Sequence, residues 1–182
     1  MTFSELVRHR RSCRKFTDAP IPPETLRSIL DDALTAPSSK NVRSTRFMVV
    51  GDPETLERIS EMRDFGSSFV RGAKQAVVVL GDTQATDLWR ENCAISATLL
   101  QLSAEAQGLG SCWVHVHGRP RLHDVPEGEQ AEEYLARLLE VPEPLGILCV
   151  VALGYPAEPP RPHRERDDSD KINKSIIKIR IV

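Results

Sequence analysis

The sequence predicts a mixed central β-sheet flanked by helices, and three observations carry this expectation. Strand-like patterns are separated by helical patterns along residues 1–156. A long stretch of small and apolar residues in the middle of the chain is typical of a buried helix. Hydrophobic residues make up 40% of the 182 positions, which is ordinary for a globular protein and enough to form a substantial core.

The elements follow one another in a regular order. Thr2 and Glu5 have the spacing of a capping box, and Asp52 and Pro53 are residue types that favour a helix cap and first position. The predicted elements are a helix from residue 3, a helix over 24–36, a strand over 46–50, a helix from 53, a strand over 76–80, the central helix, a strand over 111–117, a helix over 131–140 and a strand over 145–153.

The central helix is predicted within residues 87–106. Between Cys93 and Ala106 almost every position is small or apolar and helix formers dominate, so nearly all of its circumference should be covered. Polar interruptions such as Gln101 exclude a membrane span, so the covering comes from protein. The residues that cover the helix belong either to the same domain alone or also to a second subunit. Gly108 suits the left-handed position that ends the helix.

Charge and cysteine usage narrow the class of partner and the compartment. A net charge of −2 and an aromatic content of 5% argue against nucleic-acid binding, and the charge also argues against an anionic membrane surface. The four cysteines form no C-x-x-C pair, and the amino terminus has no secretion pattern. We therefore expect a reduced, cytoplasmic protein with no nucleic-acid or membrane partner.

Two polar segments are candidates for ligand binding. The segment from Arg10 to Lys15 has three arginines, a lysine and a serine, which can present forked donors to phosphate or carboxylate. Its alternative is a solvated basic helix end favoured by the helix dipole. The loop over 36–44 is either a plain turn or a row of donors and acceptors for the edge of a ligand ring.

The composition changes after Pro156. Prolines and charges dominate the next residues, which predicts an extended arm over 157–182 following a domain over 1–156. Isoleucines alternate with basic residues over 177–181. This alternation indicates a strand added to an exposed sheet edge of this or another subunit, and its alternative is a frayed tail.

Four motifs occur in one order along the chain: Arg10-Arg11-Ser12-Cys13-Arg14-Lys15-Phe16, Ala36-Pro37-Ser38-Ser39-Lys40-Asn41, Gly108-Leu109-Gly110-Ser111-Cys112-Trp113 and Gly154-Tyr155-Pro156. Together they resemble the nitroreductase-like family of FMN-dependent NAD(P)H oxidoreductases over residues 1–156. The resemblance implies an α+β sandwich, a homodimer with the long helix at its interface, and two FMN sites between the subunits. It also implies hydride transfer from NAD(P)H through flavin N5 to a small organic electron acceptor such as a nitroaromatic or quinone. The alternative is a non-catalytic flavin-binding or ligand-sensing protein on the same fold.

The resemblance also implies which residues bind the cofactor. These are Arg10, Arg11, Ser12, Arg14, Pro37, Ser38, Ser39, Asn41, His115, Val116, Arg161 and Arg164. Arg10 and Ser12 correspond to the phosphate and ribityl contacts, and Arg11 lies in the same motif. Arg14 corresponds to the residue at the pyrimidine end of the flavin. No catalytic residue is expected, because the hydride passes without a protein acid, base or nucleophile.

The remaining site residues have implied positions around the ring and the phosphate. Those of the 37–41 loop would come from the other subunit and border the ring, and the backbone at His115 and Val116 would pass the N5 region. Arg161, Arg164 and Lys171 are candidates for a further phosphate contact.

One departure from the family pattern bears on the substrate. The family commonly continues the Asn of the second motif with Gln-Pro-Trp, whereas here Val42, Arg43, Ser44 and Thr45 follow. Arg43 adds charge near the expected ligand edge, which favours an anionic acceptor or NADPH.

Two further motifs could carry other chemistry, and each has a plain structural alternative. His115 and His117, with His123 and Asp124, could indicate a metal site, but a His-x-His pair is more often one polar face of a strand, and no metal is expected. Cys112 could act as a nucleophile, but a cysteine in an apolar strand is usually an inert core residue.

Overall fold

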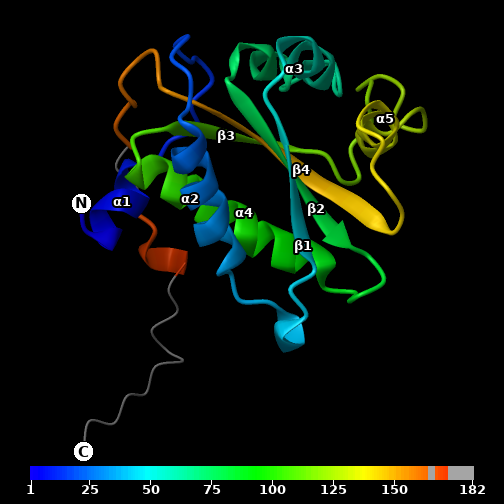
Figure 1. The fold of residues 1–182 in the computed structure, drawn as a ribbon, viewed down its shortest axis with the longest axis horizontal. Coiled ribbons are helices and arrows are strands. Elements are labelled where there is room, and N and C mark those ends of the chain that lie inside the picture. Colours follow the sequence, from blue (N-terminus) through cyan, green and yellow to red (C-terminus); the bar gives the residue numbers. More distant parts are fainter. Residues whose placement is uncertain (164–166, 172–182) are drawn as a thin grey trace, which may run out of the picture.

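A four-stranded antiparallel sheet organises the computed structural model, which describes residues 1–163 and 167–171 (Figure 1). The strand order is β1 (Thr45–Val50), β2 (Gln75–Asp82), β4 (Leu145–Gly154) and β3 (Gly110–His115). Helices cover both faces of this sheet, so the expected α+β sandwich is confirmed.

The sheet is antiparallel rather than mixed. Strands β2 and β3 run in the same direction and are joined by the long helix α4 (Trp89–Ala106), as in a parallel crossover. Strand β4, which comes later in the chain, lies between them and pairs antiparallel with both. Among the described residues, the parallel pairing is confined to an isolated bridge between Ser12 and Ser111.

The two faces of the sheet bury separate clusters. Val77 and Val79 of β2 point toward α2 (Pro23–Leu34) and α4. The alternate residues Ala76 and Val78 point toward the other face. There the sheet is covered by α3 (Pro53–Ser60), by the 3₁₀ turn η2 (Ser68–Gly72) and by α5 (Ala131–Leu138). Burial on both faces explains why β2 and β4 are apolar at nearly every position.

The shorter elements begin close to where the sequence predicted, although β3 ends at His115 rather than at residue 117 and α5 ends at Leu138 rather than at residue 140. Helix α1 (Phe3–His9) has the expected capping box of Thr2 and Glu5. The Asp52 side chain accepts the Thr55 N–H at the start of α3, and Gly108 has a φ of 79° after α4. Two further 3₁₀ turns are η1 (Ser39–Asn41) and η3 (Ser169–Lys171).

Helix α4 is covered on only part of its circumference within one subunit. Cys93, Ala97 and Leu100 are fully buried against the sheet and α2. A stripe on the opposite side is exposed, and it contains Ile95, of which 40% is accessible, and Thr98. The expectation of nearly complete burial is therefore wrong for the single subunit, because no other described element covers this stripe.

Two predictions fall on parts of the chain without a described structure. The strand expected over 177–181 and the phosphate contact expected from Arg164 lie outside the described residues. Among the helices of the described part, none is long and apolar enough to cross a membrane.

Candidate functional site

A cavity of about 1110 Å³ lies between the end of α1, the end of α4, the start of β3 and the segment 156–163. In Figure 1, α1 and the amino terminus lie on the left side of the molecule, beside the end of α4. Five of the predicted cofactor-binding residues line the cavity, namely Arg10, Arg11, Ser12, Arg14 and Arg161. The structure thus brings together residues from both ends of the sequence.

Two glycines allow the amino-terminal segment to cross the sheet at this cavity. Gly110 and Gly154 face each other in the β3–β4 register. A Cβ on Gly110 would lie 2.6 Å from the Cys13 Cβ, and one on Gly154 would lie 2.8 Å from Phe16 Cδ1. Any side chain at either position would push the segment away.

Backbone hydrogen bonds hold the crossing segment in place. The Cys13 N–H donates to the Ser111 carbonyl at 2.9 Å, and the Thr17 N–H donates to the Tyr155 carbonyl at 2.8 Å. Three of the four motifs that carry the family resemblance therefore meet at this point. Their side chains and backbones together form the wall of the cavity.

Arg11 has a structural role at the end of α1. Its Nη1 donates to the carbonyls of Arg8, His9 and Arg10 at 2.8, 3.1 and 2.7 Å. A cation at this position satisfies carbonyls that have no partner within the helix and interacts favourably with the helix dipole. This is the role that the alternative interpretation gave to the whole basic segment, and it applies to this one residue.

The Arg11 guanidinium is bound to backbone carbonyls, whereas those of Arg10 and Arg14 have no such partner within residues 1–163 and 167–171. Neither Arg10 nor Arg14 pairs with a carboxylate in these ranges. The Arg14 guanidinium lies 5.7 Å from the centre of the Phe69 ring. Ser12 is exposed, and the pKa of the Cys112 thiol is raised chiefly by burial. The raised pKa disfavours a nucleophilic thiolate at Cys112.

The two carboxylates of the cavity are both paired. Glu105 Oε1 lies 2.5 Å from His9 Nδ1, and the Lys15 ammonium donates to Glu158 Oε1 at 2.6 Å. The Lys15 hydrogen bond lowers the pKa of the Glu158 carboxyl, and the charge of Arg161 lowers it further. With both acids neutralised, Arg10 and Arg14 leave the cavity with excess positive charge. This donor set suits a phosphate or another anion.

The pair of His9 and Glu105 was not predicted from the sequence. It ties α1 to the last turn of α4, and only 10% of the Glu105 side chain is accessible. The sequence contained one indication of such a pair, which is the position of Glu105 near the predicted end of the central helix. An acidic residue in the last turn of a helix interacts unfavourably with the helix dipole, so a nearby cation is expected. The partner could not be identified, since the two residues are 96 positions apart.

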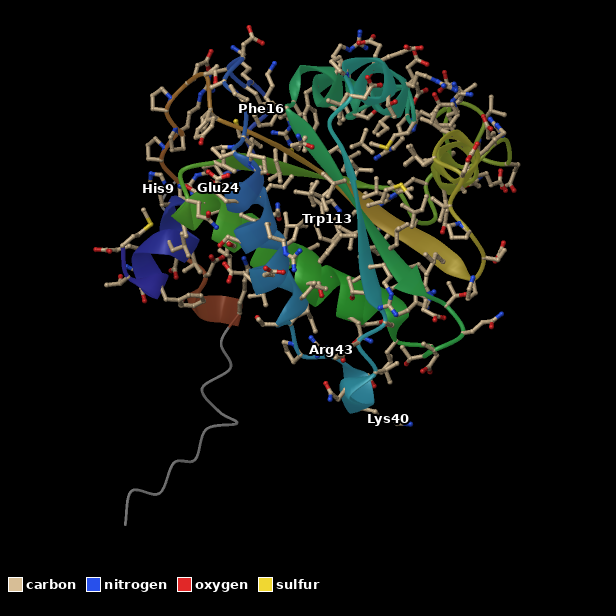
Figure 2. The ribbon with its side chains drawn as sticks, viewed as in Figure 1. His9, Phe16, Glu24, Lys40, Arg43 and Trp113 are labelled. Carbon is tan, nitrogen blue, oxygen red and sulfur yellow. The ribbon has the colours of Figure 1, made fainter. Side chains whose placement is uncertain are left out.

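The predicted residues of the second motif lie elsewhere in the chain. Pro37, Ser38, Ser39 and Asn41 follow α2 at the end of the molecule remote from His9, where Figure 2 labels Lys40. None of them lines the cavity of its own subunit. A contact between this loop and a ligand in the cavity therefore requires a second subunit.

His115 and Val116 also lie outside the cavity lining. The Val116 side chain is fully buried, and its N–H donates to the Leu148 carbonyl at 3.1 Å. The His115 ring stacks on Trp113 with centroids 6.2 Å apart. Its pKa is lowered by burial first and then by the charges of Arg119 and its other basic neighbours.

The candidate metal ligands do not converge in the part of the chain that the structure describes. His117 Nδ1 lies 2.9 Å from Glu132 Oε2, and the His123 N–H donates to Asp64 Oδ2. Within the described ranges, no three His, Cys, Asp or Glu side chains are placed to hold one metal ion.

Comparison with known proteins identifies the class to which this fold and cavity belong. The Nitroreductase family model matches residues 7–155, and the chain belongs to that family. A protein of Methanothermobacter thermautotrophicus, assigned as NADH dehydrogenase/NAD(P)H nitroreductase, is 35% identical over 176 residues, which cover 95% of this chain and 86% of the relative. An NADH dehydrogenase of Thermus thermophilus is 31% identical, covering 82% of this chain and 84% of its own length.

A solved structure gives the same result in three dimensions. The FMN-dependent nitroreductase of Clostridium difficile R20291 superposes with a TM-score of 0.83 at 34% identity. The superposition covers 96% of this chain and 97% of the other. The family inferred from the four sequence motifs is confirmed.

Proposed function

We propose that this protein is an FMN-dependent oxidoreductase that transfers hydride from NAD(P)H to a small organic acceptor such as a nitroaromatic or a quinone. The observation that carries the proposal is the cavity in which Arg10 and Arg14 lie without carboxylate partners among the described residues. FMN has a dianionic phosphate that needs such donors, and when bound it supplies hydride transfer between the nicotinamide and the acceptor. The relatives named above support the same assignment.

Different residues of the cavity would bind different parts of the cofactor. Arg10 and Ser12 would bind the phosphate and the ribityl chain, and Arg161 would add a further cation to the phosphate. Arg11 fixes the end of α1 from which Arg10 projects. Arg14 would lie at the pyrimidine end of the ring, where a fixed cation stabilises negative charge in the reduced state. Arg164, outside the described residues, is a further candidate for the phosphate.

The active form in this proposal is a homodimer with α4 at its interface. The exposed stripe that contains Ile95 would be covered by the partner. Dimerisation would bring Pro37, Ser38, Ser39 and Asn41 of one subunit to the cofactor of the other, which explains why they are remote from their own cavity. The arm over 157–182 begins along the cavity, and its end would reach the partner. Four free thiols favour a reducing compartment such as the cytoplasm.

The test combines binding and turnover. Protein reconstituted with FMN should oxidise NADPH or NADH in the presence of menadione or nitrofurazone. Protein that holds FMN and fails to turn over with either coenzyme would instead be a flavin-binding or sensing protein. Protein that does not bind FMN at all would contradict the proposal.

A further inference from the structure

We propose that Lys40 and Arg43 form a binding site for the 2′-phosphate of NADPH. This inference rests on the proposed function, because only a dimer brings the loop that carries them beside a bound flavin. Figure 2 labels both residues at the lower end of the molecule, Lys40 within η1 and Arg43 shortly before β1.

The backbone of this loop is held in an unusual conformation. Lys40, Asn41 and Arg43 have φ values of 50°, 55° and 51°, which side-chain-bearing residues rarely adopt. Each such residue is energetically disfavoured, so the surrounding structure must impose the conformation. Left-handed residues of this kind concentrate at functional sites.

Buried groups impose the loop conformation from beneath. Asn92 of α4, only 3% accessible, accepts the Ser39 N–H at 2.9 Å and donates to Ser44 Oγ at 3.1 Å. Within the loop, Ser38 Oγ accepts the Arg43 N–H at 2.9 Å. The loop is therefore fastened on both sides of Lys40. Arg43 Nη2 also donates to the Leu34 carbonyl at 3.3 Å, which orients its exposed guanidinium.

Within the part of the chain that the structure describes, no acidic side chain neutralises the charges on the loop. Between Asp32 and Asp52 the sequence has no acidic residue. Lys40 and Arg43 are exposed and form no ion pair within residues 1–163 and 167–171. Arg46 adds a third cation, since its Nη1 donates to the Arg43 carbonyl at 2.8 Å. Like charges held together repel each other, and a bound anion relieves that repulsion.

The chemistry of the two side chains selects the anion. Arginine binds a phosphate monoester through paired donors, and lysine binds it as a compact point charge. The 2′-phosphate is the group by which NADPH differs from NADH. A site of this kind therefore sets the preference between the two coenzymes, while the cavity around Arg10 sets the affinity for FMN.

The experiment measures coenzyme preference in Lys40→Gln and Arg43→Gln. For the holoenzyme, the ratio of kcat/KM with NADPH to that with NADH should fall about tenfold in each variant, which corresponds to the loss of one charged contact. Arg43→Lys should keep part of the preference, because it retains the charge. Arg58→Gln, which removes an exposed arginine from α3 on the other face of the sheet, should leave the ratio at the wild-type value.

A binding measurement separates this inference from the proposed function. Isothermal titration calorimetry of FMN-treated protein with adenosine 2′,5′-bisphosphate and with 5′-AMP reads the 2′-phosphate contact without turnover. Wild type should prefer the bisphosphate, and the two glutamine variants should lose that preference. Equal binding of both nucleotides by wild type, or an unchanged coenzyme ratio in both variants, would overturn the site. If the variants changed only the preference for 4-nitrobenzoate over 4-nitrobenzamide, the two cations would bind the electron acceptor and not the coenzyme. This outcome would also overturn the proposed 2′-phosphate site.

Discussion

Cys13 lies directly over Gly110, so closely that a Cβ on the glycine would come within 2.6 Å of the Cys13 Cβ. This contact sets the height at which the segment 12–17 crosses the sheet, and with it the position of Arg10 and Arg14 beside the cavity. The phosphate-binding geometry in our proposal thus depends on the absence of a side chain at residue 110.

Gly110→Ala should weaken FMN binding and destabilise the fold. Overpacking of this kind costs about 1 to 3 kcal/mol, and the segment must move to relieve it. FMN titration and urea unfolding measure the two effects. Gly72→Ala is the matched control, because a Cβ there meets no atom within 4 Å and the residue has no positive φ. An alanine at 110 that left both quantities at their wild-type values would show that the crossing does not position the site.

Arg10→Gln and Arg11→Gln should have different effects. Arg10 has no carboxylate partner in the described part of the chain, and its loss should raise the Kd for FMN about 10-fold to 100-fold. Arg11 caps α1 through its Nη1, so its loss should lower the free energy of unfolding by about 0.5 to 1 kcal/mol. Its effect on FMN affinity should be the smaller of the two. Equal losses of FMN affinity would mean that both guanidinium groups bind the cofactor.

The sequence predicted the helices and strands well because their signals are local. The capping box at Thr2, the proline after Asp52 and the left-handed Gly108 act within a few residues. The strand order could not be predicted in the same way. The insertion of β4 between β2 and β3 depends on pairing between distant segments, and it makes the sheet antiparallel.

The candidate site was predictable in part for a similar reason. The family resemblance identified Arg10, Ser12 and Arg14, and the glycine motifs marked the close crossing that brings them to the cavity. The His9–Glu105 pair could not be found, since it joins the two ends of separate helices. The positive φ values of Lys40 and Arg43 also could not be predicted from the sequence, because neither residue type favours this conformation.

Ile95→Arg should convert the proposed dimer into monomers. The residue is 40% exposed in one subunit and lies on the face of α4 that no described element covers. A buried arginine without a partner is strongly unfavourable at an apolar interface. Light scattering after gel filtration should give the monomer mass, and bound FMN should be lost with the partner's loop. Leu122→Arg, at an exposed position outside α4, is the control and should keep the wild-type mass.

Cys93 should make the stability of the fold fall at alkaline pH. Burial raises the pKa of its thiol to about 11, so the folded state favours the neutral form. The contribution is fully present below the pKa of the unfolded thiol, about 8.5, and is lost as the pH rises toward 11. Wild type should therefore lose up to about 3 kcal/mol more than Cys93→Ala over this interval. Urea unfolding at pH 8 and pH 10.5 measures the difference, and parallel losses in the two proteins would contradict the assignment.

The central claim is that the basic cavity holds FMN and that the bound flavin accepts hydride from NAD(P)H. The most direct measurement is the visible spectrum of the purified protein after incubation with FMN and removal of the unbound flavin. We expect flavin absorbance to remain with the protein and to bleach when NADPH or NADH is added without oxygen. Protein that emerges colourless after this treatment would contradict the account.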